Sequence, residues 1–132
     1  MTNQVHRTDI QVRFADSDAL GHINNASYAT YAEMARLTFL STLGESVQRM
    51  ILANLVIDFR RQVLVTDEVH VDSWIERLGT SSMSIAHTIL ANGERAADIT
   101  SVVVYFDYAS SKAMPLTEAM RTGLASYVRE KV

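Results

Sequence analysis

Residues 16–28, DSDALGHINNASY, gather side chains suited to acid–base chemistry in one short segment. Two carboxylates, Asp16 and Asp18, lie two residues apart, and His22 and a pair of asparagines follow them. A carboxylate can activate water as a general base, or it can attack a carbonyl carbon directly. The segment precedes a long apolar stretch, so we interpret it as the connection that leads into a helix.

The second half of this segment has the features of a helix N-terminus. Asn24 is a favourable N-cap, and Ile23 and Tyr28 can pack across it as a hydrophobic staple. Asn25 then takes the first helical position, where its backbone N–H has no partner within the helix. Such an N–H can stabilise oxygen charge that develops during acyl transfer, by about 3 kcal/mol per well-aimed donor. Turn formation and capping also explain Asp, Asn and Gly here, so spacing alone leaves both interpretations open.

Apolar periodicity predicts the elements that hold this segment. Ile10, Val12 and Phe14 alternate with polar residues, which predicts a strand with one buried face that ends near Phe14. Apolar residues then recur at three- and four-residue steps over residues 25–43, which predicts a helix buried on most sides. Gly44 follows as the expected left-handed cap. The apolar residues around the rest of the circumference are Ala29, Met34, Leu37 and Leu40.

The second half of the chain predicts a sheet. Four segments rich in β-branched residues follow the helix, and Asn92-Gly93 between the last two is a strong hairpin signal. We expect four successive strands joined by short turns, as an antiparallel meander. After Pro115, helical spacing predicts a short C-terminal helix. Residues 1–132 are therefore expected to form a single α+β domain, a five-stranded antiparallel sheet curled around a long central helix. The four segments are residues 50–65, 67–78, 81–91 and 94–108.

Composition argues against several classes of function. The chain has 12 Lys+Arg and 15 Asp+Glu, a formal net charge of −3, and no basic run, so nucleic acid is not an expected partner. It has no cysteine, which fits a reducing cytoplasm. No apolar run approaches the ~20 residues of a membrane span, and no secretory leader is present, so a soluble, cytoplasmic protein is expected. The four histidines lack ligand spacing, and no metal site is predicted.

The polar segment, together with its flanks, resembles a known family signature. RFADSDALGHINNASYATYAEMAR is similar to the signature of hotdog-fold thioesterases of the 4-hydroxybenzoyl-CoA thioesterase-like family. LVIDFRRQVLVTDEVHVDSWIERLGTSSMSI resembles the later strands of the same family, so the similarity spans nearly the whole chain. The chain departs from the pattern at Gln62, where many members have proline.

The resemblance implies roles for the residues of the polar segment. The second aspartate of the family's pair is the catalytic carboxylate, which corresponds to Asp18, and Asp16 becomes a supporting residue that shapes the loop. The backbone N–H that binds the thioester oxygen corresponds to Asn25. His22 and Asn24 match the remaining motif and are expected to orient water or the carbonyl.

The resemblance also implies substrate, assembly and cofactor requirements. Members of the family act on fatty or aromatic acyl groups carried by coenzyme A or acyl carrier protein, without a metal or redox cofactor. The net charge of −3 favours coenzyme A over an acidic carrier protein. Members assemble as dimers whose sheets join edge to edge, with active sites at the interface, so a homodimer or homotetramer is expected.

Several other residues are candidates for the same reaction. Glu33 lies one helical turn before Arg36 and pairs with it in the simplest interpretation, yet it is the alternative catalytic acid because related hotdog enzymes can place their carboxylate on this helix. The serines are expected along the pantetheine path and the basic residues near the nucleotide phosphates, although a polar turn and surface charge explain them almost equally well. The residues expected to contact substrate are Tyr28, Ser81, Ser82, Arg60 and Lys112.

Three functions are compatible with this sequence. Hydrolysis of acyl-CoA thioesters to free acid and coenzyme A is the main prediction, with Asp18 as nucleophile or general base. An acyl-CoA hydratase or dehydratase of the hotdog type is the second, and would use Asp18 together with His22. A noncatalytic acyl-CoA-binding module is the third, and would not need Asp18.

Overall fold

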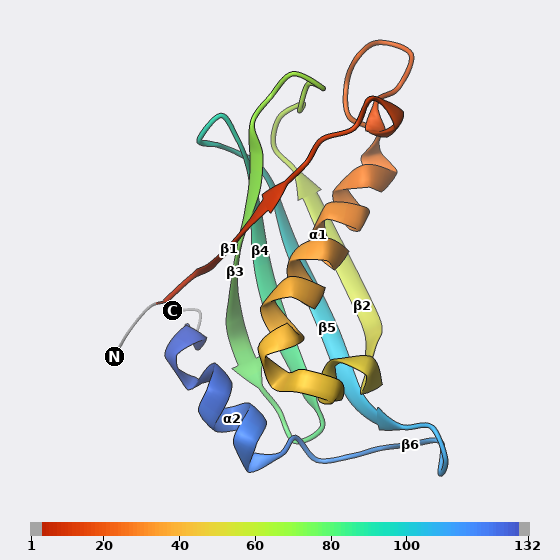
Figure 1. Ribbon diagram of the computed structural model, residues 1–132, viewed down its shortest axis with the longest axis vertical. Helices are drawn as coiled ribbons and strands as arrows, with labels where there is room; N and C mark the ends of the chain where they lie inside the picture. Colours follow the sequence, from red (N-terminus) through yellow and green to blue (C-terminus); the bar gives the residue numbers. More distant parts are fainter. Residues whose placement is uncertain (1–3, 130–132) are drawn as a thin grey trace.

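The structure, a computed structural model, describes residues 4–129. A curled antiparallel sheet lies along one side of the long helix α1, and the short helix α2 lies near the lower end of the sheet (Figure 1). This arrangement confirms the predicted fold class. The strands are β1 His6–Ile10, β2 Met50–Phe59, β3 Val69–Leu78, β4 Ser82–Ala91, β5 Glu94–Asp107 and the two-residue β6 Lys112–Ala113. The helices are α1 Asn25–Leu40 and α2 Glu118–Leu124, with 3₁₀ segments η1 Phe14–Asp16, η2 Ser41–Arg49 and η3 Ala125–Tyr127.

The order of the strands differs from the predicted meander. The sheet has the order β1-β3-β4-β5-β2, so β2 pairs with β5 at the far edge and not with β3. Only β3, β4 and β5 follow one another as a meander. The connection over residues 60–68 is too long for a tight hairpin, and Val63 within it is buried in the core. Its carbonyl accepts the N–H of Ile23 at 2.7 Å, which ties the connection to the entrance of α1.

The predicted hairpin between β4 and β5 is confirmed. Asn92 has φ 52° and Gly93 has φ 81°, both in the left-handed region that this type of two-residue turn requires. The Asn92 side chain also accepts the N–H of Glu68 at 2.9 Å, so the turn is linked to the start of β3.

Helix α1 is shorter and less enclosed than predicted. It ends at Leu40, and Gly44, with φ 67°, lies inside the 3₁₀ segment that follows. Met34 and Leu37 are 41% and 49% exposed, so burial on most sides was wrong. The reason is that the sheet curls around one face of the helix only. That face carries the buried residues Tyr28, Tyr31, Ala32, Ala35, Arg36, Phe39 and Leu40.

The first strand also ends earlier than the alternation predicted. β1 stops at Ile10, and Phe14 begins a 3₁₀ turn in which it is 85% exposed. The backbone N–H and the guanidinium of Arg13 both bind the Asp16 carboxylate. These local bonds turn the chain, so the period-2 pattern through Phe14 did not continue as a strand.

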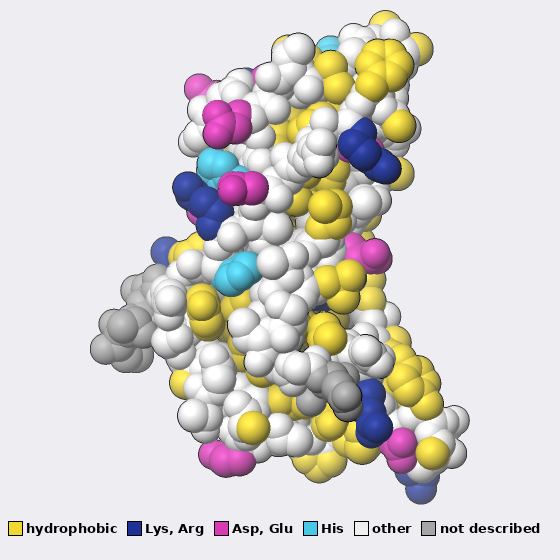
Figure 2. Space-filling view, viewed as in Figure 1, with side chains coloured by type: hydrophobic (Ala, Val, Ile, Leu, Met, Phe, Trp, Pro, Cys, Tyr) yellow, Lys and Arg dark blue, Asp and Glu magenta, His cyan; other side chains and the backbone are white. Residues whose placement is uncertain are grey.

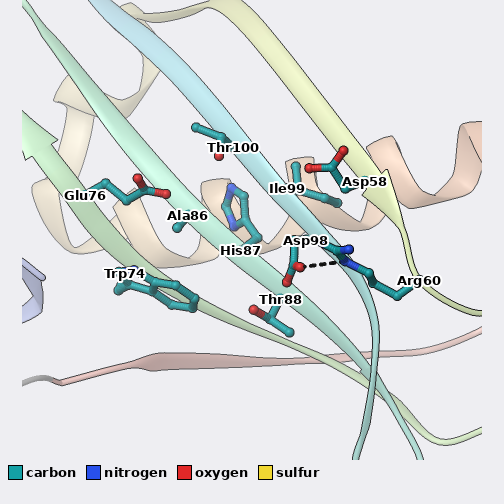
Figure 3. A pocket seen from close by; sticks show the side chains of 10 residues that line it. All are labelled: Asp58, Arg60, Trp74, Glu76, Ala86, His87, Thr88, Asp98, Ile99 and Thr100. Carbon is teal, nitrogen blue, oxygen red and sulfur yellow. Dashed lines mark hydrogen bonds and ion pairs between the residues drawn. The ribbon is translucent and has the colours of Figure 1, made fainter. Parts of the chain in front are cut away.

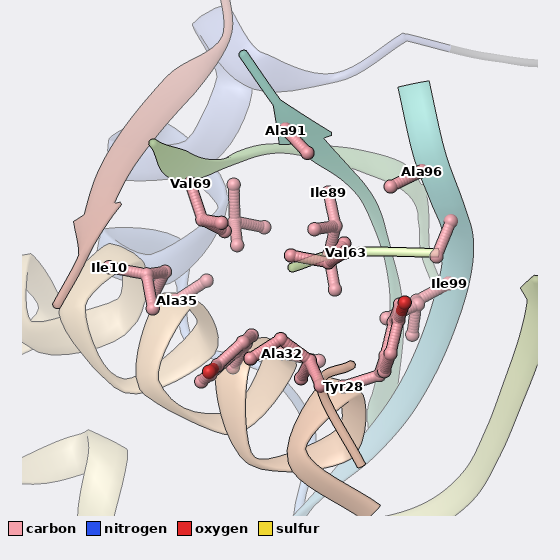
Figure 4. Close-up of a cluster of buried hydrophobic side chains, with 14 residues drawn as sticks. Ile10, Tyr28, Ala32, Ala35, Val63, Val69, Ile89, Ala91, Ala96 and Ile99 are labelled. Atoms are coloured by element: carbon pink, nitrogen blue, oxygen red, sulfur yellow. The ribbon is translucent and has the colours of Figure 1, made fainter. Parts of the chain in front are cut away.

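The core consists of two apolar clusters with buried polar side chains between them. The cluster near the start of α1 joins that helix to the sheet and to Val63 (Figure 4). Arg36 donates to Ser101 Oγ at 3.2 Å, and His87 lies between Ser101 Oγ at 3.1 Å and Ser73 Oγ at 2.8 Å. Burial, with a further contribution from the positive charge of Arg36, lowers the pKa of His87 to about 3. His87 is therefore neutral in the folded protein at ordinary pH.

Candidate active site

The loop that carries Asp18 is closed by its own hydrogen bonds. The Asp18 N–H donates to the carbonyl of His22 at 2.7 Å, and Asp18 Oδ1 accepts the N–H groups of Leu20 at 2.8 Å and His22 at 3.1 Å. Gly21 has φ 81°, a backbone conformation that other residues adopt only with strain. The sequence DALGH therefore forms a tight turn with the Asp18 side chain fixed on its surface.

Asp16 connects this loop to α1. It is 3% exposed and accepts hydrogen bonds from Arg13 and, at 2.7 Å, from the hydroxyl of Tyr31. Burial by itself would raise the pKa of Asp16, but the bonds from Arg13 and Tyr31 outweigh it and lower the pKa below its usual value. Its carbonyl also accepts the N–H of Asn24 at 2.8 Å. Asp16 thus occupies the position of a loop-shaping residue.

The start of α1 has the geometry that the sequence indicated. Asn24 is the N-cap, and its side chain accepts the N–H of Ala26 at 2.8 Å. Ile23 and Tyr28 are both buried in the same cluster, as a hydrophobic staple requires. Within residues 4–129, the Asn25 N–H meets no hydrogen-bond acceptor. This N–H is therefore a free donor at the positive end of the helix.

A cavity of about 390 Å³ opens where the loop, the helix start and the end of β2 meet. It brings together five of the residues selected from the sequence, although Arg60 follows the other four in the chain only after the rest of α1, η2 and β2. Phe59 is a lining residue that the sequence analysis missed. Its place in the apolar alternation of β2 was the available signal, but which strand end approaches the loop depends on the sheet order. The cavity is lined by Asp18, His22, Ile23, Asn25, Tyr28, Phe59, Arg60, Arg61 and Gln62.

The other selected residues lie elsewhere in the same chain. Ser81 and Ser82 are at the β3–β4 turn, and Ser82 lies about 23 Å along β4 from Ile89, which is level with the cavity end of the sheet. Lys112 is in β6, beside the far end of β5. Glu33 is exposed on α1 and lies 4.0 Å from the Arg36 guanidinium, outside the residues that line the cavity.

Both arginines beside the cavity already have carboxylate partners. Arg60 contacts Asp98 at 3.0 Å, and Arg61 pairs with Glu94. Figure 3 shows the Arg60–Asp98 pair at a second, smaller hollow of about 250 Å³ on the outer face of the sheet, beside Trp74. The guanidinium groups therefore bring limited net charge to the cavity.

Comparison with known proteins places the chain in a family. The family model described as thioesterase-like superfamily matches residues 12–124. The chain belongs to this superfamily. FadM of Escherichia coli (strain K12), a long-chain acyl-CoA thioesterase, is 29% identical over 132 residues, which cover 93% of this chain and 99% of FadM. The predicted family and the predicted class of enzyme, a thioester hydrolase, are confirmed.

Solved structures of thioesterases have the same fold. A thioesterase from Thermus thermophilus, crystallised with coenzyme A and Zn, is 35% identical with a TM-score of 0.82, covering 88% of this chain and 94% of that one. A predicted thioesterase from Bacillus stearothermophilus is 28% identical with a TM-score of 0.88, covering 98% of this chain and 100% of that one.

In this thioesterase, a carboxylate and a backbone N–H without an acceptor in the described chain line the same cavity. Asp18 Oδ1 accepts two backbone N–H groups, whereas Asp18 Oδ2 receives no hydrogen bond from any residue that the structure describes. One carboxylate oxygen thus holds the side chain in place and the other is available to a water molecule or a carbonyl carbon. The Asn25 N–H is a donor of the kind that stabilises negative charge developing on an oxygen.

Two features are absent from the described part of the chain, a cluster of metal-ligating side chains and a membrane-spanning helix. Within residues 4–129, no group of three or more histidine, aspartate or glutamate side chains is arranged to hold a metal ion. The helices found there are all too short or too polar to cross a membrane.

Proposed function

We propose that this thioesterase hydrolyses acyl-CoA thioesters to a free acid and coenzyme A, with Asp18 and the Asn25 N–H as its reactive groups. The observation that carries the proposal is that both groups line one cavity of about 390 Å³. The name of the E. coli relative, a long-chain acyl-CoA thioesterase, and the coenzyme A in the T. thermophilus structure support this class of substrate.

In the proposed mechanism, the thioester carbonyl lies over the first turn of α1. Its oxygen accepts the Asn25 N–H, which stabilises the negative charge that forms when the carbonyl carbon is attacked. Asp18 either removes a proton from an attacking water or attacks the carbon itself, giving a mixed anhydride that water then opens. Coenzyme A leaves as the thiolate. Release of coenzyme A ahead of free acid in a rapid-quench experiment would identify the covalent route.

We also propose that the active form is a homodimer joined through β2. This strand is at the edge of the sheet, and Leu52 on it is 41% exposed. Met34 and Leu37 on the open side of α1 are 41% and 49% exposed. Figure 2 shows hydrophobic side chains along this side of the molecule. An unpaired strand edge with apolar neighbours favours pairing with a second copy. Light scattering should give a dimer mass for the wild type and a smaller mass for Leu52→Glu.

Two-fold pairing of β2 with its copy also gives Lys112 a role. An antiparallel pair of β2 strands places the Met50 end of one protomer beside the Phe59 end of its partner. Lys112 lies at the same end of the sheet as Met50, because β6 pairs with the end of β5 that lies next to Met50. In the proposed dimer, this lysine approaches the cavity of the other protomer, where it can meet the phosphates of coenzyme A.

Substitution of the proposed catalytic carboxylate tests the function. Asp18→Asn keeps an oxygen that can accept the two backbone N–H groups but cannot act as base or nucleophile. We expect acyl-CoA turnover, followed as free thiol release, to fall about a hundredfold or more with little change in melting temperature. Asp9→Asn, an exposed carboxylate on β1 outside the cavity, is the matched control and should retain activity. Undiminished turnover by Asp18→Asn would remove Asp18 from the mechanism.

A further inference from the structure

Few of the residues that line the cavity are apolar. Six of its lining residues are polar or charged, and three are hydrophobic or aromatic: Ile23, Tyr28 and Phe59. Ile23 is 4% exposed and Tyr28 is 3% exposed, so the core already covers both side chains. Phe59 is 50% exposed. Of these three side chains, Phe59 is therefore the one with the most surface left for a ligand to cover.

The Phe59 ring is held in position by its neighbour. It packs edge to face against Tyr28, with ring centroids 5.0 Å apart. Tyr28 is itself fixed by burial and by a long hydrogen bond of 3.4 Å from its hydroxyl to the Arg61 carbonyl. Phe59 is also the last residue of β2, so its backbone is set by the register with Ala97 on β5. A fixed aromatic ring makes a defined wall, whereas a mobile side chain would adapt to any acyl group.

The position of the Phe59 ring suits it to contact the acyl chain of a substrate. A carbonyl bound at the Asn25 N–H projects the acyl chain and the thiol arm in different directions. The acyl chain is apolar and gains free energy by covering apolar surface. The thiol arm carries amides and phosphates, which suit the polar lining formed by Arg60, Arg61 and Gln62. Phe59 is therefore the surface that matches the acyl chain.

We infer that Phe59 determines acyl-group selectivity, by supplying the apolar wall on which the first carbons of the acyl chain pack. This inference rests on the proposed function, because it assumes that an acyl-CoA occupies the cavity. It adds a selectivity-determining residue that acts on the acyl group and takes no part in bond breaking. Removal of the ring should reduce the preference for longer acyl chains and leave the hydrolysis of acetyl-CoA comparatively intact.

The test compares an acyl chain that can cover the ring with one that is too short to do so. The ratio of kcat/KM for octanoyl-CoA to that for acetyl-CoA should fall about tenfold in Phe59→Ala and less in Phe59→Leu, which keeps part of the apolar surface. In parallel, calorimetry measures the Kd of S-octyl-CoA, a thioether that cannot be hydrolysed, against that of coenzyme A. The preference for the thioether should fall by a similar factor in Phe59→Ala.

Val56→Ala is the matched control. Val56 lies on the same strand and is 48% exposed, but strand alternation places its side chain on the opposite face of the sheet. Its ratios should equal those of the wild type. An unchanged ratio in Phe59→Ala, or an equal fall in Val56→Ala, would overturn the inference while leaving the proposed hydrolysis intact.

The binding measurement separates the two proposals. A wild type that hydrolyses no acyl-CoA contradicts the proposed function, and the binding ratios then decide the role of Phe59 by themselves. Equal affinity of the wild type for S-octyl-CoA and coenzyme A would overturn the inference, because no apolar wall would then contribute to binding.

Discussion

Acidification should destabilise this protein through His87. The ring is buried between Ser73 and Ser101 with Arg36 nearby, and its pKa is lowered from 6.5 to about 3. In the unfolded chain His87 binds a proton near pH 6.5, whereas in the folded protein it stays neutral until the pH approaches 3. The stability gained by keeping His87 neutral is therefore fully present above pH 6.5 and declines as the pH falls from 6.5 towards 3. Between pH 7.5 and pH 5.5 the loss in free energy of unfolding should be about 1.4 kcal/mol.

Urea unfolding at these two pH values, at fixed protein concentration, measures the loss directly. His87→Gln cannot take up the proton, so its stability should vary less between pH 7.5 and pH 5.5, whatever its absolute stability. The lowered pKa of His6, caused by partial burial, adds a smaller effect of the same sign to both proteins and cancels in the comparison. Asp16 titrates below its usual 3.8 and does not contribute in this range. Equal losses in wild type and His87→Gln would refute the reasoning.

Three further substitutions test the structure around the site. Asp16→Ala should cost about 2–3 kcal/mol of stability, measured by urea unfolding, because it leaves Arg13 and the buried Tyr31 hydroxyl without their acceptor. Asn24→Ala should cost about 1 kcal/mol through loss of the N-cap bond, with a matching fall in melting temperature. Gly93→Ala should cost about 1 kcal/mol because alanine is strained at φ 81°, without changing acyl-CoA turnover. An unchanged stability would contradict the hydrogen bonds assigned to Asp16 or Asn24, or the backbone strain expected at Gly93, for the substitution concerned.

Local chemistry made much of the site predictable from the sequence. The N-cap at Asn24, the free first-turn donor at Asn25 and the turn centred on Gly21 all follow from the preferences of residues close together in the chain. The same is true of the Asn92-Gly93 hairpin and of the buried stripe on α1. These features depend on interactions within a few residues, which is the range over which a sequence pattern is informative.

Sequence patterns failed where a distant segment or a competing local bond decided the outcome. The strand alternation through Phe14 was interrupted because Arg13 bonds to Asp16. The exposure of Met34 and Leu37 followed from the limited curl of the sheet, which periodicity cannot report. The predicted meander paired β2 with β3, whereas β2 pairs with β5. No local signal in residues 60–68 indicates which strand β2 joins.

By itself, the sequence determined the fold class, the family resemblance and the loop that carries Asp18, since these reside in short-range preferences and a contiguous motif. Only the tertiary structure decided that β2 ends beside that loop, so that Phe59 and Arg60 line the same cavity as Asp18 and Asn25. It also separated Ser82 and Lys112 from the cavity within one chain. The physical reason is that strand order is set by how the whole sheet covers the apolar face of α1, a property of the packed molecule and not of any one segment.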